Sequence, residues 1–240
     1  LSRARRVIFP HNDVAALEKL LRGEAGAARK FVVVESLFSM DGDAAPLAEY
    51  AALCRETGSA LIVDEAHAVG ICGAAGSGLM EARSIADDVF VSVNTAGKAM
   101  GVSGAFVAGS TDAIETLIQE ARPFIFSTAP PPAVAAALEA SLEVIASEPE
   151  RRARLVALSR YLRERLGMCG DSHIVPVIIG DNQRSMMVAR ELQAVGFDVR
   201  AIRPPTVPPD TARLRVSLNC DLTEEILDRF VEALERAMHI

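Results

Sequence analysis

Three short apolar runs, each followed by polar residues or glycines, constrain the fold of this chain most strongly. The runs are FVVVESL (Phe31–Leu37), ALIVD (Ala60–Asp64) and VFVSV (Val89–Val93). Their length and their β-branched residues predict strands, the first buried on both faces and the second also buried. A loop and a helical segment lie between the first two runs, a glycine-rich loop (residues 68–78) lies between the second and the third, and another glycine-rich turn follows the third. Strands that alternate with helices or long loops indicate an α/β fold with a largely parallel sheet.

A proline-rich stretch, APPPAV (Ala129–Val134), marks a change of pattern. Before it, we also predict a helix capped by Asn12 or Asp13 and a helix over residues 111–122. After it come two long helical segments, then shorter strands and helices in alternation. We therefore predict that residues 1–132 belong to a larger α/β domain and that residues 133–240 form a smaller α+β domain.

The segment LIVDEAHAVG (Leu61–Gly70) contains the Asp-Glu-Ala-His string that names a group of helicases. A nucleotide hydrolase also needs the phosphate loop GxxxxGK[ST] ahead of this string, and nothing before Asp64 fits that pattern. The net charge of −7 further disfavours a surface for nucleic acid, which calls for a basic patch. We predict that the chain has no nucleic-acid partner.

Two other classes of site are also disfavoured. No run of about 18 or more apolar residues occurs, so the sequence predicts no membrane span. The four cysteines are scattered without CxxC pairing, so we predict no metal site and interpret them as buried free thiols.

Three ionisable residues follow neighbouring predicted strands. Asp64 ends one strand, His67 comes three residues later, and Lys98 lies beyond the next strand between Gly97 and Gly101. Ligands of open α/β sheets bind at the carboxyl ends of the strands. A lysine that forms a Schiff base and a carboxylate that pairs with a pyridine nitrogen suit pyridoxal phosphate. Taken singly, the three residues also fit a strand-end cap, a loop histidine and a surface charge.

Longer motifs resemble a known family, the α-oxoamine synthases, which have the aspartate-aminotransferase-like fold of type I pyridoxal-phosphate enzymes. The matching motifs are ESLFSMDGDAAPL (Glu35–Leu47), LIVDEAHAVGICGAAGSG (Leu61–Gly78), NTAGKAMGVSGAF (Asn94–Phe106) and FIFSTAPPP (Phe124–Pro132). The segments SHIVPVIIGDN (Ser172–Asn182) and AIRPPTVPPDTARLRVSLN (Ala201–Asn219) are most similar to the members that serve biotin biosynthesis. This resemblance implies a large domain with a mainly parallel sheet and a small C-terminal α+β domain.

The resemblance also implies a reaction and its site. The reaction is the decarboxylative condensation of L-alanine with a pimeloyl thioester, carried by coenzyme A or by a carrier protein. Lys98 and His67 would be catalytic, with Asp64 on the pyridine nitrogen of the cofactor. The other implied residues are Ser39, Thr95, Ser127 and Thr128 for the cofactor, and Thr206 and Arg215 for the substrates. The resemblance further implies a cytoplasmic homodimer, in which Ser127 and Thr128 would reach the phosphate bound by the other subunit.

Alternatives within and outside this chemistry stay open. A sister enzyme would act on glycine with acetyl-CoA or on serine with palmitoyl-CoA, and a catalytically inactive structural or ligand-sensing subunit could share the fold. The resemblance starts well inside the family's length, past its phosphate-binding glycine loop and its ring-stacking histidine. We therefore expect this chain to be part of a longer one and to be inactive by itself.

Overall fold

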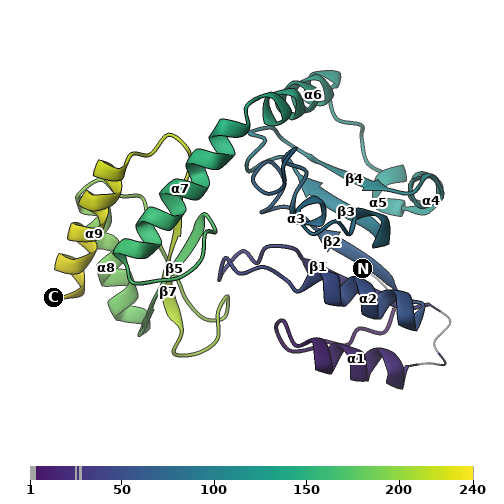
Figure 1. Cartoon of the computed structure of the whole chain (residues 1–240), viewed down its shortest axis with the longest axis horizontal. Coiled ribbons are helices and arrows are strands. Elements are labelled where there is room, and N and C mark those ends of the chain that lie inside the picture. Colours follow the sequence, from purple (N-terminus) through teal and green to yellow (C-terminus); the bar gives the residue numbers. More distant parts are fainter. Residues whose placement is uncertain (1–3, 25, 27–28, 240) are drawn as a thin grey trace. The chain divides into compact units, whose positions relative to one another are not determined.

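The computed structural model describes residues 4–24, 26 and 29–239, and these residues form two compact units (Figure 1). The first unit contains the described residues up to Leu37 together with Ala44–Ser147. The second contains Phe38–Asp43 and the described residues from Glu148 onward.

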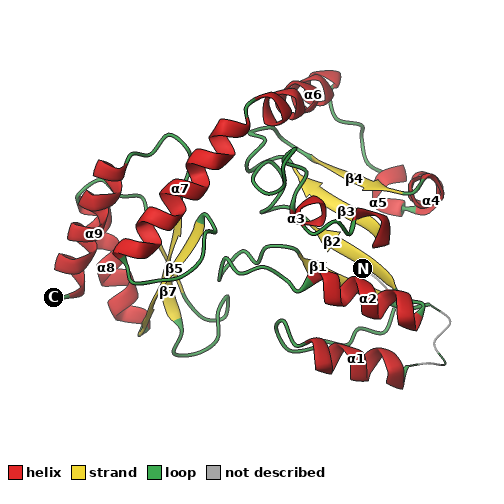
Figure 2. Ribbon diagram, viewed as in Figure 1, coloured by secondary structure: helices red, strands yellow, loops and turns green. Residues whose placement is uncertain are grey.

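The first unit is built on a four-stranded sheet in the order β1-β2-β3-β4 (Figure 2). The strands are β1 (Phe31–Glu35), β2 (Ala60–Asp64), β3 (Val89–Thr95) and β4 (Ala105–Gly109). Strands β1, β2 and β3 are parallel, and β4 is antiparallel to β3. The predicted α/β fold with a largely parallel sheet is confirmed.

Helices complete the first unit: α1 (Val14–Gly23), α2 (Leu47–Thr57), α3 (Leu79–Ala82), the 3-10 turn η1 (Ala86–Asp88), α4 (Thr111–Glu120), α5 (Arg122–Ile125) and α6 (Pro132–Ser147). Of the two cap candidates, Asp13 caps α1, because its side chain accepts a hydrogen bond from the Ala16 amide at 2.8 Å. Helix α2 packs on β2, and α1 packs on α2 (Figure 1). Tyr50, Leu61 and Val63 lie fully buried in this layer.

Helix α6 belongs to the first unit, although the sequence pattern placed residues 133–240 in one C-terminal domain. Its Ser141 hydroxyl donates a hydrogen bond to the Met100 carbonyl at 3.0 Å. Leu138 and Ile145 of the same helix pack on the buried residues around Met100. These contacts move the division between the compact units to the position after Ser147.

The prediction that β1 is buried on both faces is wrong. Val32 and Val34 are buried, but Phe31 is 51% exposed and Val33 is 65% exposed. β1 is the edge strand of the sheet, and only the face that bears Val32 and Val34 is covered by described residues. Apolar content alone does not reveal which face of a strand has a partner.

The helix predicted over residues 111–122 ends earlier in the structure. α4 stops at Glu120, Ala121 has an extended conformation, and α5 starts at Arg122. Pro123 explains the break, because proline has no amide hydrogen with which to continue a helix but fits its first turn.

The second unit is an α+β layer. Its sheet has the order β5-β7-β6 and is antiparallel throughout. The elements are α7 (Pro149–Arg165), β5 (Ile174–Gly180), α8 (Asn182–Ala194), β6 (Arg200–Ile202), β7 (Ala212–Ser217) and α9 (Glu224–Met238). Helix α9 packs against both α7 and α8 (Figure 1). In the second unit, the rings of Phe197 and Phe230 pack edge to face, with their centroids 5.4 Å apart.

The segment Phe38–Asp43 joins the second unit through its contacts with β5 and β7. The Asp41 carboxylate accepts a hydrogen bond from Arg213, a β7 residue that is only 4% exposed. Gly42 lies so close to the Ile174 carbonyl that a β-carbon there would overlap it, and its φ of +67° also suits glycine.

No helix in the described part of the chain is long and apolar enough to cross a membrane. The described residues also bring together no group of three or more His, Cys, Asp or Glu side chains that could hold a metal ion. The four cysteines, all among the described residues, form no disulfide with one another, and the prediction that they are buried holds for Cys54 and is wrong for the other three.

Candidate active site

Asp64 stands at the carboxyl end of β2, as its sequence position predicted. Its Oδ1 accepts a hydrogen bond from the Ala66 amide at 2.8 Å, which fixes the orientation of the carboxylate. In the sheet Asp64 is paired with Glu35 of β1 and with Val93 of β3. Paired residues of neighbouring strands point to the same side of a sheet. The Asp64 carboxylate therefore projects from the half-exposed face, the one that also carries Val33.

Thr95 lies on this same face, two residues beyond Val93 in β3. Its Oγ1 is buried and has no hydrogen-bond partner among the described residues. A buried hydroxyl without a partner is uncommon and costs free energy. An atom from a ligand that accepts or donates a hydrogen bond here would remove this cost.

His67 lies in the tight turns that follow β2. The amides of Ala68 and Val69 donate to the Glu65 carbonyl at 2.9 and 2.8 Å, so the chain reverses directly around His67. The His67 ring is half-buried. Three residues separate it from Asp64, and this short loop keeps both side chains at one end of β2.

Lys98 lies in a compact turn after β3, which we call the lysine turn (residues 96–102). The Val102 amide donates to the Ala96 carbonyl at 2.9 Å, and the Gly101 amide donates to the Lys98 carbonyl at 3.0 Å. Gly101 has a φ of +63°, which this close turn requires. The Lys98 side chain itself is exposed, so its amine is accessible to a reactive carbonyl.

The loop that bears His67 packs on the lysine turn. Val69, Ala96 and Met100 form one buried cluster, to which Phe106 and Ile145 add partly buried side chains. This packing brings together the ends of β2 and β3. The structure thus groups Asp64, His67, Thr95 and Lys98 at one edge of the first unit.

Ser39 and Arg215 are brought together in the second unit. The Arg215 guanidinium donates from Nε to the Ser39 carbonyl and from Nη1 to the Ser217 hydroxyl at 3.0 Å. Burial lowers the pKa of Arg215 below its ordinary value. The Ser39 carbonyl, rather than its hydroxyl, thus accepts this hydrogen bond from the Arg215 guanidinium.

Ser127 and Thr128 follow α5 in the first unit, and both are exposed. The Ser127 hydroxyl donates to the carbonyl of Pro123, one turn earlier. Exposed hydroxyls at this position are compatible with a contact to a second subunit, which stays a prediction.

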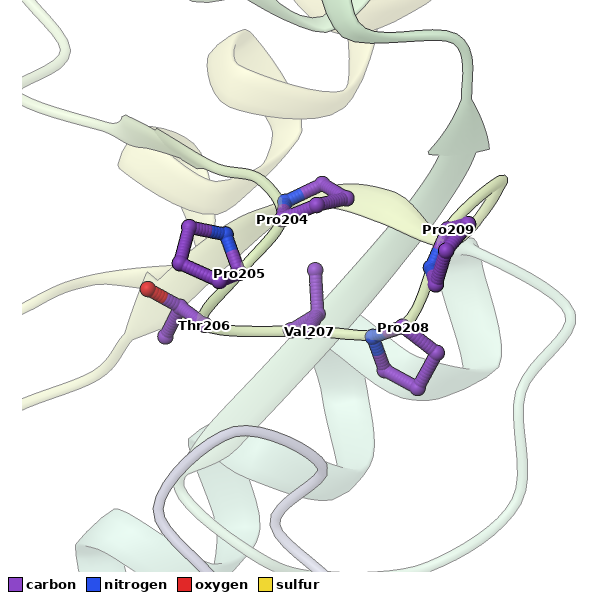
Figure 3. Close-up of a pocket in the computed structure, with 6 residues that line it drawn as sticks. All are labelled: Pro204, Pro205, Thr206, Val207, Pro208 and Pro209. Atoms are coloured by element: carbon purple, nitrogen blue, oxygen red, sulfur yellow. The ribbon is translucent and has the colours of Figure 1, made fainter.

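Thr206 lies in a proline-rich loop of the second unit. This loop curls around an open hollow lined by Pro204, Pro205, Thr206, Val207, Pro208 and Pro209 (Figure 3). Val207 is buried and anchors the loop, whereas Thr206 is exposed. The lining is almost entirely apolar, which suits an alkyl chain better than a charged group.

Sequence reasoning missed Glu65, which is completely buried beside Asp64. Its carboxylate accepts hydrogen bonds from the Ser36 hydroxyl at 2.6 Å and from the Leu79 and Met80 amides at 3.0 and 2.7 Å. The available signal was partial: alternation along the chain places Glu65 opposite to Asp64, but the sequence does not show that this opposite face is covered.

Comparison with known proteins places this geometry in context. The aminotransferase class I and II family matches residues 1–234. Proteins named 8-amino-7-oxononanoate synthase are similar to the chain: the one from Anaeromyxobacter dehalogenans (strain 2CP-C) is 49% identical and that from Marinobacter nauticus 47% identical. The alignments cover 99% and 100% of this chain, and 61% and 62% of the relatives. The chain thus spans about three fifths of the length of these curated relatives.

Solved structures show the same fold. A serine palmitoyltransferase from Sphingomonas wittichii superposes with a TM-score of 0.91 at 32% identity, over 95% of this chain and 59% of that one. An 8-amino-7-oxononanoate synthase from Francisella tularensis superposes with a TM-score of 0.83 at 26% identity, over 96% of this chain and 68% of that one. Because the family match extends over nearly the whole chain, the protein belongs to the class I and II aminotransferase family.

Proposed function

We propose that this chain is part of a pyridoxal-phosphate-dependent enzyme that condenses L-alanine with a pimeloyl thioester. The products are 8-amino-7-oxononanoate, carbon dioxide and the free thiol of the acyl carrier. The observation that carries the proposal is the grouping of Asp64 and Thr95 on one sheet face beside the lysine turn. Relatives named 8-amino-7-oxononanoate synthase, at 49% and 47% identity, support this choice of reaction.

The residues present fit pyridoxal phosphate. The exposed Lys98 amine suits the covalent attachment of an aldehyde. The oriented Asp64 carboxylate suits a protonated pyridine nitrogen, and the buried, unpartnered Thr95 Oγ1 suits a polar group of the ligand. When bound, the cofactor supplies an electron sink for a carbanion at the α-carbon of the amino acid.

The side chains of the first unit then have separate tasks. Lys98 would hold the cofactor, and its amine would serve as the base that takes the α-proton of L-alanine. Asp64 keeps the pyridine nitrogen protonated through a charge-assisted hydrogen bond. His67 donates a hydrogen bond to the phenolic oxygen of the ring or to an oxyanion that develops during condensation.

The side chains of the second unit bind the substrates. Arg215 holds the carboxylate of L-alanine through a two-pronged charge-assisted bond. Within the protein, Arg215 Nε donates to Ser39 and Nη1 donates to Ser217. We therefore assign Nη2 as one of the two donors to the L-alanine carboxylate. Thr206, on the apolar proline-rich loop, contacts the acyl chain. Ser39 offers its hydroxyl to the cofactor.

We propose a homodimer in the cytoplasm, in which Ser127 and Thr128 contact the phosphate held by the second subunit. The exposure of both hydroxyls supports a partner at this position. Light scattering of the complete gene product would give twice the mass of one chain, and cell fractionation would locate the enzyme. A monomer with full activity would refute the shared site.

A sister reaction, between L-serine and palmitoyl-CoA, is the second candidate. The structural similarity to serine palmitoyltransferase, with a TM-score of 0.91 at 32% identity, favours it. The higher identity to the 8-amino-7-oxononanoate synthases favours L-alanine and the pimeloyl thioester. The third alternative is a catalytically inactive subunit on the same fold. Such a subunit would not require Lys98, so the presence of this lysine disfavours that alternative.

The complete gene product tests these alternatives directly. Release of thiol from pimeloyl-CoA or from a pimeloyl carrier protein should occur only when L-alanine is supplied. Glycine with acetyl-CoA and L-serine with palmitoyl-CoA serve as competing pairs. The Lys98→Ala variant should lose the visible absorbance of covalently bound pyridoxal phosphate. An unchanged band in this variant, or thiol release with any other pair alone, would overturn the proposal.

A further inference from the structure

Glu65 is a fully buried carboxylate for which the proposed reaction has no use. Burying an unpaired carboxylate is costly, so a protein retains one only where strong donors surround it. Here three groups donate to the two oxygens: the Ser36 hydroxyl, the Leu79 amide and the Met80 amide. A carboxylate, whose two oxygens accept hydrogen bonds, matches this set of donors.

These hydrogen bonds connect three parts of the first unit. Ser36 directly follows β1, and Leu79 and Met80 begin α3. The backbone amide of Glu65 donates to the Val93 carbonyl in β3 at 2.8 Å. A single residue therefore ties the ends of β1 and β3 to the start of α3.

The chain between Glu65 and α3 forms a closed loop, which we call the glycine loop (residues 66–78). The Gly70 amide donates to the Gly76 carbonyl at 2.8 Å, and the Gly78 amide donates to the Cys72 carbonyl at 2.9 Å. Gly78, at the far end, leaves no space for a side chain, because a β-carbon there would lie 2.5 Å from Glu65 Oε2. Both ends of the glycine loop are thus fastened at Glu65.

The glycine loop packs against the lysine turn. Val69 is buried against Ala96 and Met100, which lie on either side of Lys98 in the chain. Gly70 is packed against Ala99, since a β-carbon at Gly70 would lie 2.9 Å from Ala99 Cβ. A shift of the glycine loop would therefore change the packing of the backbone that carries Lys98.

We propose that Glu65 is a positioning residue, which sets the lysine turn and His67 relative to Asp64 by fastening the glycine loop. This inference rests on the proposed function, because it assigns Lys98 to the cofactor. Glu65 acts through the loop and touches no reacting atom. Glu81 offers a matched comparison, since its carboxylate holds the same loop from its outer side, through the Ala75 and Ser77 amides.

The test compares the Glu65→Gln and Glu81→Gln variants of the complete gene product. The side-chain amide introduced by Glu65→Gln has one acceptor oxygen for three donors, so the glycine loop should loosen. Hydrogen exchange, measured without cofactor, should rise about tenfold in Glu65→Gln at residues 66–78 and also at residues 96–102. In Glu81→Gln it should rise within residues 73–78 alone.

A second readout uses the cofactor. The pH midpoint of the visible band of pyridoxal phosphate bound to Lys98 should shift in Glu65→Gln and stay at the wild-type value in Glu81→Gln. A purely structural loss of stability would leave this midpoint in place. If exchange at residues 96–102 is unchanged in Glu65→Gln, or if both variants shift the midpoint equally, the proposal is wrong.

Two further arms keep the outcomes separate. If Glu65→Gln does not fold, the Ser36→Ala variant takes its place in the same comparison, because it removes one of the three donors to the Glu65 carboxylate. If the wild-type protein shows no visible band with pyridoxal phosphate, the proposed function fails. The exchange measurements need no cofactor, so they still decide whether Glu65 controls the lysine turn.

Discussion

Gly70 packs directly against Ala99, the residue that follows Lys98 in the chain. A β-carbon built on Gly70 would lie 2.9 Å from Ala99 Cβ and 3.3 Å from Ile145 Cδ1. This contact joins the loop after β2 to the turn after β3, and the two loops carry His67 and Lys98. The geometry of the candidate site therefore depends on a residue that has no side chain.

The Gly70→Ala variant should be destabilised by about 1–3 kcal/mol. Its φ of +79° disfavours any side chain, and the added methyl group would overlap Ala99. Urea unfolding would measure the loss. Gly23→Ala is the matched control, because nothing lies within 4 Å of a β-carbon at Gly23. Equal stability of the two variants would contradict the packing argument.

Replacing Thr95 with valine should not lower the unfolding free energy when no cofactor is present, and should raise it by up to about 1 kcal/mol because an unsatisfied buried hydroxyl is removed. The buried Oγ1 makes no hydrogen bond with the described residues, so none of these is lost. With pyridoxal phosphate, the same change should weaken binding about tenfold, the equivalent of one hydrogen bond.

The control for this variant is Thr57→Val, far along the chain from the lysine turn. The Thr57 hydroxyl donates to the Leu53 carbonyl at 2.7 Å, so its removal should cost about 1 kcal/mol and leave cofactor affinity unchanged. Unfolding and fluorescence titration of both variants would check the pair. A loss of stability in cofactor-free Thr95→Val would show that the hydroxyl already has a partner.

The stability conferred by Glu81 should depend on pH. Burial opposes its ionisation, but the Ala75 and Ser77 amides donate to the carboxylate and bring its pKa below the ordinary value of 4.5. Since the folded state holds this proton less tightly than the unfolded state, the contribution is complete above about pH 4.5 and is lost as the pH falls through the lowered pKa. Unfolding of the wild type and of Glu81→Gln between about pH 3 and about pH 6 should show their difference shrinking in acid. A difference that stays constant across this range would contradict the assignment.

Arg163 should be sensitive to a change as small as Arg163→Lys. Its guanidinium is buried and donates to the carbonyls of Cys169, Ser172 and Ile174 at 2.9, 3.3 and 2.7 Å. A single ammonium group lacks the planar fork that reaches all three, so we expect a loss of about 2–4 kcal/mol in urea unfolding. Arg160→Lys, at an exposed ion pair with Asp171, should change stability by less than about 1 kcal/mol. Similar losses for both variants would argue against the role of the fork.

The sheet and part of the site could be predicted because local patterns determine them. Short β-branched runs predicted β1, β2 and β3, and Asp64 had to lie at a strand end once ALIVD was recognised as a strand. The Asp13 cap likewise needs only the residues of its own turn.

The rest depends on contacts between distant residues. Phe31 and Val33 have the composition of buried residues, yet nothing in their own segment shows that one face of β1 lacks cover. Glu65 and Asp64 are adjacent acids, and only tertiary packing makes the first a buried anchor and leaves the second half-exposed. Whether Arg215 acts on a substrate carboxylate stays a prediction of the same kind.

The segment Phe38–Asp43 has a practical consequence for dissecting the protein. These six residues lie within the sequence of the first unit but pack in the second. Asp41 forms an ion pair with Arg213, and Gly42 packs against Ile174. Cutting the chain after Ser147 would strip the C-terminal portion of this insert and leave a buried cation without its carboxylate. A truncation or chimera that isolates the second unit should therefore also carry residues 38–43. A continuous stretch of the sequence does not contain the whole of this unit.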